Sequence, residues 1–384
     1  SGLGSWAAGS GHPASTTIGS ITRGRRLRRD IRDNLSVTKP SAWVSSVDFS
    51  MRLERLTLTD WDDVLPARGF EPFHTADALS VLDDHASGRL HLFAGYNGGN
   101  PVALLPLFVQ RRAVGSVVTS PPPGFSVPRL GPILMPASPK RSKIERLNRR
   151  FAEGIVDELS LDNSRTLFYM IGNTQYTDPR PYRWADFDVE TAFTYRLDVD
   201  DRSADELLSN CSKSLRREIQ DIGESAVTIE QAGMEGTKAI YDRTAERYAQ
   251  QDEPFDLSWP YVRDLVAALD DRARSYVARD PDGDVLSGIT VLYSNDAAYF
   301  WQGGARAEYD GTTVNSAIHW RIVEDLVDEP PVDSITSYDL MGANTDRLCK
   351  YKSKFGAALV PYYTIESNGP QMALAKRAYR AISG

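Results

Sequence analysis

The sequence predicts a mixed α/β protein made of two tandem units, each a central mixed sheet flanked by helices. The chain has 384 residues, which is too many for one ordinary hydrophobic core. Its composition, 41% hydrophobic and 25% charged, is typical of a globular protein. Short strand-like runs alternate with longer runs of helical spacing, and this order of elements recurs in the second half. We therefore expect a tail at 1–46 and units at 47–190 and 191–384.

The tail is predicted to be disordered and basic. Its first part is rich in Gly, Ser, Ala and Thr and lacks a periodic apolar pattern. The stretch Arg23–Arg32 then packs six arginines into ten residues. It is either a solvated basic arm or a contact for anionic lipid or RNA. No charged segment leads into an apolar stretch of signal-peptide length, so we do not interpret the tail as a signal peptide.

The first unit is organised around a predicted hairpin. Two apolar runs flank Asn97-Gly98-Gly99-Asn100, and the paired glycines accept the positive φ angles that a tight turn needs. The elements expected in this unit are strands at 51–58, 89–96, 101–110 and 166–171 and helices at 77–85 and 140–159.

The second unit repeats the rhythm. Ser203-Ala204-Asp205-Glu206 is a capping box that predicts the start of a helix through Ile222. A second hairpin is expected at Ser294-Asn295-Asp296. The further strands expected are 193–199, 227–231, 275–279, 285–293, 297–303, 335–340 and 358–366, and the further helices are 235–250, 259–272, 312–327 and 371–382.

Bulk properties exclude several classes of protein. A net charge of −8 argues against a broad non-specific grip on nucleic acid. Two cysteines and five scattered histidines are too few, and wrongly spaced, for a disulfide scaffold or a metal site. No apolar run is long enough to cross a bilayer. We expect a cytoplasmic protein with no metal, no tightly bound cofactor and no transmembrane segment, and with membrane association as an alternative.

The most informative residues lie near the end of the chain. Tyr338-Asp339-Leu340-Met341-Gly342 has the pattern of a buried strand that ends in a carboxylate and a glycine turn. Lys352-Ser353-Lys354-Phe355-Gly356 follows and places lysines in an otherwise apolar setting. An acid, a tight backbone and a cation at one strand end can hold a polar substrate and stabilise developing negative charge.

A glycine pair precedes this region. The strand Tyr299–Gly303 ends at Gly303-Gly304, and a helix is expected soon afterwards. Free amides at a helix start can receive an anion such as phosphate. The alternative is that the two glycines simply make a turn.

These motifs resemble the second acetyltransferase-like domain of Fem-type proteins, the aminoacyl transferases that build peptidoglycan bridges, and are similar to acyltransferases associated with polysaccharide synthesis. That family carries an aromatic strand ending in Gly-Gly, a helix with a central Trp, a Tyr-Asp-Phe-Gly-Gly strand and Phe-Lys-x-x-Phe-Gly. The corresponding segments here are Tyr299–Gly304, Trp320, Tyr338–Gly342 and Tyr351–Gly356. The resemblance implies two tandem units of the GNAT acetyltransferase superfamily, with the second one catalytic.

The resemblance also implies roles for the matching residues. Acyl transfer to an amine passes through an oxyanion, and the family pattern places Lys352 beside it. Asp339 would accept the proton of the attacking amine or orient the substrate, and otherwise only caps the turn. Tyr338 is a candidate acid whose alternative is a core position.

A second group of residues would bind substrate or phosphate. Arg216 and Arg217 lie on a predicted helix similar to a basic helix of the family, and an arginine fork binds two oxygens at once. Tyr351 and Lys354 flank Lys352 and join this group together with the glycine pair. The alternative for the arginines is a solvated helix face.

Three other features carry less weight. Cys349 lies close to Lys352, but no histidine is placed by the sequence to activate its thiol. His319 is expected to pack within its helix beside Trp320. The stiff loop Pro121–Gly124 either borders a cleft or braces a turn.

The expected function is transfer of an acyl or aminoacyl group onto an amine of a cell-envelope glycan or peptide precursor. The donor is left open between acyl-CoA and aminoacyl-tRNA, because neither a helical coiled-coil insertion nor a pyrophosphate loop is recognisable. Leu340-Met341 also departs from the family's Phe-Gly, and Tyr351 from its Phe. The alternatives are an acyl-CoA-dependent N-acetyltransferase acting on a small molecule and a non-catalytic scaffold.

Overall fold

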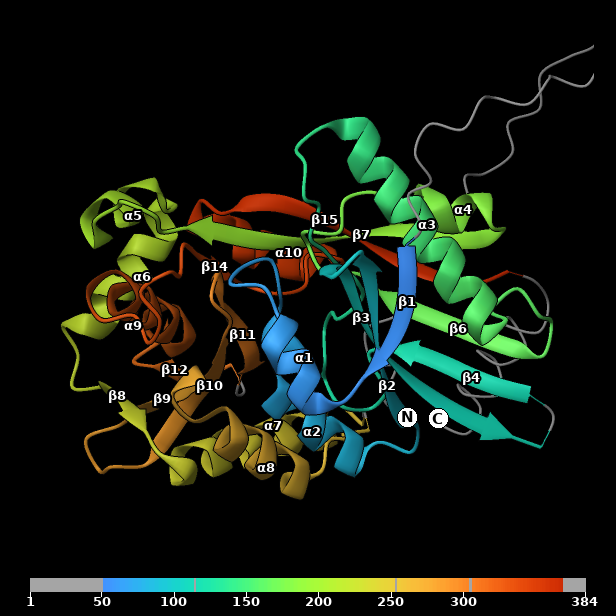
Figure 1. Ribbon diagram of the computed structural model, residues 1–384. Coiled ribbons are helices and arrows are strands. Elements are labelled where there is room, and N and C mark those ends of the chain that lie inside the picture. The colour runs from blue at the N-terminus through green and yellow to red at the C-terminus, as the bar shows by residue number, and fades with distance from the viewer. Residues whose placement is uncertain (1–50, 114, 253, 304–305, 369–384) are drawn as a thin grey trace, which may run out of the picture.

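A computed structural model describes residues 51–113, 115–252, 254–303 and 306–368 (Figure 1). The predicted tail at 1–46, the predicted helix at 371–382 and Gly304 lie outside these residues. Within them the predicted mixed α/β class is confirmed: helices flank one large mixed sheet. None of the described helices combines the length and apolar character needed to cross a bilayer.

The main sheet has thirteen strands in the order β1-β2-β3-β4-β6-β15-β7-β14-β11-β10-β9-β8, with β5 paired to β3. A separate two-stranded ribbon joins β12 to β13. The strands are β1 (Met51–Leu56), β2 (Arg89–Asn97), β3 (Asn100–Arg112), β4 (Gly115–Ser120), β5 (Ile133–Leu134), β6 (Thr166–Ile171), β7 (Phe187–Asp198), β8 (Thr228–Ala232), β9 (Ala273–Arg279), β10 (Val285–Tyr293), β11 (Ala297–Gly303), β12 (Glu308–Tyr309), β13 (Thr312–Thr313), β14 (Ser337–Asp339) and β15 (Ala358–Ser367).

The helices pack in three places around this sheet. In Figure 1, α1, α2, α7 and α8 lie between the strands of the two halves, α3 and α4 cover the first half, and α5, α6 and α9 cover the second. The helices are α1 (Leu58–Val64), α2 (Ala76–His85), α3 (Arg141–Leu159), α4 (Arg180–Trp184), α5 (Ala204–Asn210), α6 (Lys213–Gly223), α7 (Met234–Gln250), α8 (Trp259–Leu269), α9 (Val314–Asp328) and α10 (Asp346–Lys352).

Three hydrophobic clusters correspond to these places. One joins α1 and α2 to α8, with Trp61, Leu79 and Tyr261 fully buried, so the two halves share a core. A second lies under α3 and α4, and a third lies between the second half of the sheet and α5, α6 and α9. β3 and β10 are buried over more than half of their length, which accounts for their long apolar runs, whereas β1, β7, β8 and β15 are mostly exposed or half-buried.

The sheet is continuous across the middle of the chain. The late strand β15 pairs antiparallel with β6 on one side and with β7 on the other. β7 in turn pairs with β14. β7 also runs across the predicted boundary between 47–190 and 191–384, and that division stays a prediction.

Several sequence-based elements are confirmed closely. The Asn97–Asn100 turn joins β2 to β3, and Gly98 has a φ of 61° as the turn requires. The predicted strands at 166–171, 285–293 and 297–303 match β6, β10 and β11 residue for residue. Strongly patterned segments with clear turn signals were thus located well.

Several predicted elements were wrong in their extent. The strand expected at 193–199 already begins at Phe187, the strand expected at 335–340 spans only Ser337–Asp339, and the helix expected at 259–272 ends at Leu269. The helix expected from Ser203 through Ile222 is two helices, because Cys211 is extended and Ser212 accepts from the amide of Leu215 to cap α6. The strand expected at 51–58 ends at Leu56, since Thr57 and Asp60 form a capping box that starts α1.

A close backbone contact fixes the loop that follows β4. Gly131 has a φ of 70°, and a Cβ there would lie 2.7 Å from the Cα of Gly172. Gly98 has a similar φ of 61°, but nothing lies within 4 Å of its Cβ position. The loop therefore approaches the end of β6 as closely as only glycine allows.

We expect Gly131→Ala to lower the free energy of unfolding by about 3 kcal/mol, because it adds a backbone clash to left-handed strain. Gly98→Ala carries the strain without the clash and should cost about 1 kcal/mol. Urea denaturation of the two variants measures the difference. Equal losses in the two variants would show that the close approach has no energetic weight.

Candidate functional site

Lys352 is the last residue of α10, a helix that Thr345 caps by accepting from the amide of Leu348. Its side chain turns inward and is only 5% exposed. The ammonium Nζ donates to the carbonyl oxygens of Met341 and Gly342, and it lies 5.4 Å from the centre of the Phe300 ring. Lys352 is therefore a buried cation on a helix end, held over an aromatic face.

The carbonyls that hold Lys352 belong to a left-handed turn at the end of β14. Met341 has a φ of 55° and Gly342 a φ of 54°. A non-glycine residue in this region is strained and needs support. The support comes from Asp339, whose Oδ1 accepts from the Met341 amide at 2.8 Å. The acid thus shapes the turn that binds the cation.

Burial lowers the pKa of Lys352 to about 8, although the nearby Asp339 carboxylate and Cys349 oppose the shift. Desolvation disfavours the charged form, and the attraction of the carboxylate compensates only partly. A lysine with this pKa is still largely protonated at neutral pH but titrates within reach of it. Within the described part of the chain the ammonium has two acceptors, which leaves one of its three N–H groups for a substrate oxygen.

Asp339 is almost fully enclosed, with 1% exposure. Its Oδ2 accepts from Arg129 at 2.6 Å, and its Oδ1 accepts from the Thr194 hydroxyl at 2.5 Å as well as from the backbone. A carboxylate with this many donors is committed to holding structure. The geometry favours the orienting role over acceptance of a proton from the substrate.

The Arg129 guanidinium is the centre of a buried ion network that the sequence did not reveal. Arg129 lies in the loop between β4 and β5 and is 1% exposed. Its Nε and one terminal nitrogen donate to the two carboxylate oxygens of Glu71, at 3.0 and 3.2 Å. The rings of Tyr299 and Tyr362 lie 5.8 and 5.3 Å from its guanidinium carbon. We call Glu71, Arg129 and Asp339 the buried triad.

The members of the buried triad stabilise one another's charge. Burial raises the pKa of Glu71, and the Arg129 charge opposes that rise. Burial by itself would lower the pKa of Arg129, but Asp339 and Glu71 together raise it above its usual value. The guanidinium stays charged and donates to the side-chain oxygens of both acids.

The opposite face of β14 is packed with aromatic groups. Tyr338 is fully buried, and its hydroxyl lies 2.8 Å from Nδ1 of His319. Burial, with the Lys352 charge adding to it, lowers the pKa of His319 to about 3, so the ring is neutral. Burial raises the pKa of Tyr338 well above its usual value. These two residues occupy core positions, as expected for His319 and as the alternative for Tyr338.

Tyr351 and Lys354 lie on the α9 side of the same region. The Glu218 carboxylate accepts from the Ser316 hydroxyl at 2.6 Å and from Lys354 at 3.2 Å. The Tyr351 hydroxyl lies 3.4 Å from that of Ser316. Sequence reasoning missed Glu218, although it follows the two arginines that were singled out. This polar set ties α6, α9 and α10 together.

Among the residues predicted to bind phosphate, the two arginines have partners on their own segment of the chain, and Gly303 contacts the Phe300 ring that also lies near Lys352. Arg216 donates to the carbonyl of Ser209 at 3.3 Å, and Arg217 lies 3.5 Å from Asp221 with its side chain 81% exposed. Gly303 packs instead against the Phe300 ring, which would lie 2.3 Å from a Cβ. The ribbon β12–β13 separates Gly303 from α9, so the strand does not lead directly into the helix.

The remaining residues singled out in the sequence have structural contacts. The Cys349 thiol lies 3.2 Å from the carbonyl oxygen of Ala343. Beyond Pro121–Gly124, the carbonyl of Ser126 accepts from the indole of Trp301 at 2.9 Å. The segment just after Pro121–Gly124 therefore contacts the second half of the chain.

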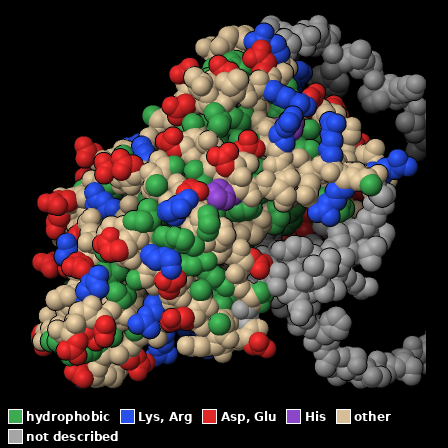
Figure 2. All heavy atoms as spheres, turned by 90° about the horizontal axis from the view of Figure 1, so that it is seen from below, with side chains coloured by type: hydrophobic (Ala, Val, Ile, Leu, Met, Phe, Trp, Pro, Cys, Tyr) green, Lys and Arg blue, Asp and Glu red, His purple; other side chains and the backbone are tan. Residues whose placement is uncertain are grey.

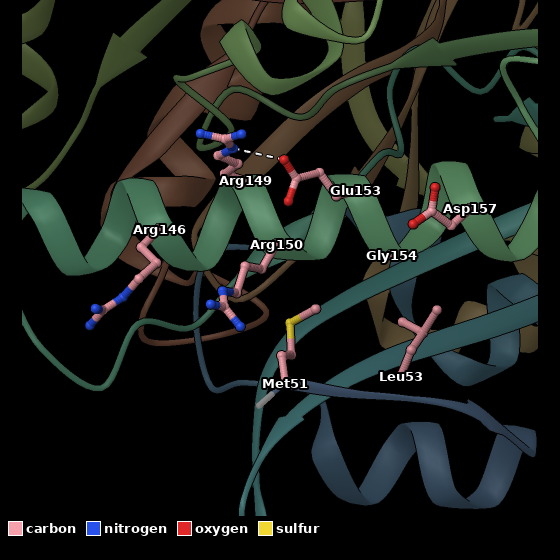
Figure 3. Close-up of a pocket in the computed structure, with 8 residues that line it drawn as sticks. All are labelled: Met51, Leu53, Arg146, Arg149, Arg150, Glu153, Gly154 and Asp157. Carbon is pink, nitrogen blue, oxygen red and sulfur yellow. Dashed lines mark hydrogen bonds and ion pairs between the residues drawn. The ribbon is translucent and has the colours of Figure 1, made fainter. Parts of the chain in front are cut away.

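Two surface hollows lie away from Lys352. The larger, about 550 Å³, is lined by residues of β1 and α3, among them Arg149 and Glu153, which pair with each other (Figure 3). The smaller, about 220 Å³, lies where β7, β14 and β15 meet and is lined by Arg196 and Ser337 among others. All of its lining residues belong to 191–384. Lys352 lines neither hollow.

The face that carries α2 and α8 has mixed charge (Figure 2). Acidic and basic side chains alternate over it, with hydrophobic side chains between them. This face therefore presents no patch of a single sign of charge to which a polyanion would bind.

Comparison with protein families finds a match over the segment that contains Lys352. Residues 209–353 match the model described as Acetyltransferase (GNAT) domain. The matched segment contains both Asp339 and Lys352. No curated protein matches the chain in sequence.

Comparison with solved structures extends the likeness to most of the chain. FemX is 11% identical with a TM-score of 0.61, and the match covers 87% of this chain and 100% of that one. The C-terminal domain of a putative lysylphosphatidylglycerol synthetase from Agrobacterium fabrum is 14% identical, with a TM-score of 0.51 and coverage of 85% and 97%. At such identities the likeness is one of fold. It agrees with the GNAT-type, Fem-like resemblance of the sequence.

The free energy of unfolding should depend on pH because burial lowers the pKa of Lys352. Its pKa falls from 10.5 to about 8 on folding, so between these values the unfolded chain binds more protons and stability rises with pH. From about pH 7 to about pH 10 this group should add about 2 kcal/mol to the free energy of unfolding. Urea unfolding of the wild type and of Lys352→Met at both pH values measures the increment. A difference between the two proteins that does not change with pH contradicts it.

Proposed function

We propose that this chain, whose residues 209–353 match a GNAT acetyltransferase domain, transfers an acyl or aminoacyl group onto an amine of a cell-envelope glycan or peptide precursor. One observation carries the proposal. A buried ammonium donates to the turn that follows the strand of Asp339, inside the matched domain, and one of its N–H groups has no acceptor among the described residues. The fold shared with FemX supports the Fem-type assignment.

Acyl transfer to an amine requires a positive group beside the acyl carbonyl oxygen, which becomes negatively charged during the reaction. The amine nitrogen attacks the acyl carbonyl and forms a C–N bond, and the carbonyl oxygen becomes an oxyanion. When the intermediate collapses, the bond to the donor's oxygen or sulfur breaks, and the proton of the amine passes to the leaving group or to water. Lys352 would donate its free N–H to the oxyanion. Its partial desolvation strengthens that interaction.

Asp339 and the turn would serve this step by orientation. Asp339 holds the Met341 amide, and the turn carbonyls point the ammonium in a fixed direction. An ammonium whose direction is set before the reaction needs little reorganisation when the oxyanion forms. Arg216, Arg217, Gly303, Tyr351 and Lys354 remain proposed substrate contacts, with the exposed Arg216 and Arg217 best placed for a phosphate arriving from solvent.

Lys352→Met should lower kcat/KM for acyl transfer by about 100-fold or more, because it removes an oxyanion donor. Lys350→Met is the matched control, since Lys350 lies on the same helix with its side chain 74% exposed and should leave the rate unchanged. Transfer of a labelled acyl group to an amine-bearing peptide measures both. Equal rates for wild type and Lys352→Met, with intact folding, would remove Lys352 from the mechanism and favour the scaffold alternative.

The second candidate is an acyl-CoA-dependent N-acetyltransferase with a small-molecule acceptor, which the description of the matched family favours. Calorimetry with acetyl-coenzyme A separates the candidates. Tight binding supports the thioester donor. If no heat is released, binding of an aminoacyl-tRNA by the same protein becomes the supporting result for the aminoacyl donor.

A further inference from the structure

The buried triad connects residues of the first half of the chain to the turn that holds Lys352. Glu71 precedes the short helical turn Pro72–His74, and Arg129 lies in the loop before β5, so both come from the first half. Asp339 ends β14 in the second half. The ion pair between Arg129 and Asp339 joins residues 210 positions apart in sequence. The first half thus supplies a positive and a negative charge to the strand end that carries the turn.

The first-half charges are held rigidly. The amide of Glu71 donates to Nδ1 of His74 at 3.0 Å, so Nε2 carries the proton and donates to the carbonyl of Gly131 at 3.1 Å. Burial lowers the pKa of His74 to about 4, which keeps the ring neutral and this polarity fixed. The contact ties the Glu71 segment to the loop that carries Arg129.

A chain of hydrogen bonds leads from Arg129 to the ammonium of Lys352. Arg129 bonds Oδ2 of Asp339, and the other oxygen of that carboxylate holds the Met341 amide. Met341 and Gly342 then present their carbonyls to Lys352. Each link is a hydrogen bond or ion pair between groups that are largely buried, so little solvent screens it.

We propose that Arg129 and Glu71 are positioning residues that act through Asp339 on Lys352, fixing both the direction and the charge state of its ammonium. The inference rests on the proposed function for its catalytic meaning. Its physical content, a link between the first-half charges and the titration of Lys352, stands separately. The first half then tunes the reactive group of the second without touching the substrate.

The sign of each charge gives the proposal a distinctive test. The titratable groups that act on Lys352 are Asp339 from β14 and Cys349 from its own helix, and the charge of Lys352 in turn lowers the pKa of His319 from α9. Removing the positive Arg129 leaves the field of Asp339 uncompensated and should raise the pKa of Lys352. Removing the negative Glu71 makes the surroundings more positive and should lower it.

We therefore expect opposite shifts, each of about half a unit to one unit, in Arg129→Met and Glu71→Gln. Carbon-13 NMR titration of the lysine side chains measures them, with the Lys352 signal assigned by its loss in Lys352→Met. Arg129→Lys keeps the charge and should keep the wild-type pKa more closely than Arg129→Met. Arg321→Met, which removes an ion pair to Asp325 on the exposed side of α9, should leave Lys352 unchanged.

Simple loosening of the structure gives a different result. If the variants only admit water, the pKa of Lys352 rises toward its ordinary value in both, and equal rises or no shift in either would overturn the proposal. Should Arg129→Met fail to fold, Glu71→Gln still decides the sign, because the proposal requires it to lower the pKa of Lys352 whereas loosening would raise that pKa. The two proposals also fail separately: an active Lys352→Met enzyme overturns the proposed function, whereas the NMR shifts alone decide the coupling.

Discussion

The arrangement of the whole molecule depends on one buried guanidinium. Arg129 lies between Glu71 and Asp339 where almost no solvent reaches. A charge buried in this way costs several kcal/mol unless it is paired, and removing any one partner leaves the others uncompensated. Because the partners come from both halves of the chain, the charges are satisfied only when the halves assemble in one relative position. The ion network thus adds a directional constraint to the apolar core that α2 shares with α8.

The site follows from the two faces of one short strand. In β14, Asp339 points toward Arg129, whereas Tyr338 points toward His319 and the aromatic core under α9. Side chains alternate along a strand, so a three-residue strand supplies both a polar and an apolar support. The turn that follows it is held from one side by Asp339, and Lys352 reaches it from α10. The same short strand therefore supplies both the carboxylate that supports the turn and the tyrosine that packs in the core.

The sequence predicted those features that are local and periodic. The fold class, the hairpin at Asn97–Asn100 and the strand with Tyr338 and Asp339 were all recoverable, because they are written in turn residues and in spacing. Arg129 and Glu71 were not, since neither belongs to a motif and their meaning arises only when loops distant in sequence meet. The break at Cys211 was missed for a different reason: the apolar pattern continues through it, and only the second cap at Ser212 marks it. The short helix α10 was also not predicted. The burial of Lys352, which depends on the position of that helix, could therefore not be predicted from the sequence.

The place of β15 has a consequence for biosynthesis. In chain order β15 comes after every other described strand, yet it fills the gap between β6 and β7. Until the ribosome has made and released the chain as far as residue 367, the facing edges of those two strands stay without their partner. Unpaired edges invite intermolecular pairing. In the nascent protein the sheet is therefore interrupted between β6 and β7. Insertion of β15, the last described strand, completes the sheet in a late folding event that joins residues far apart in sequence.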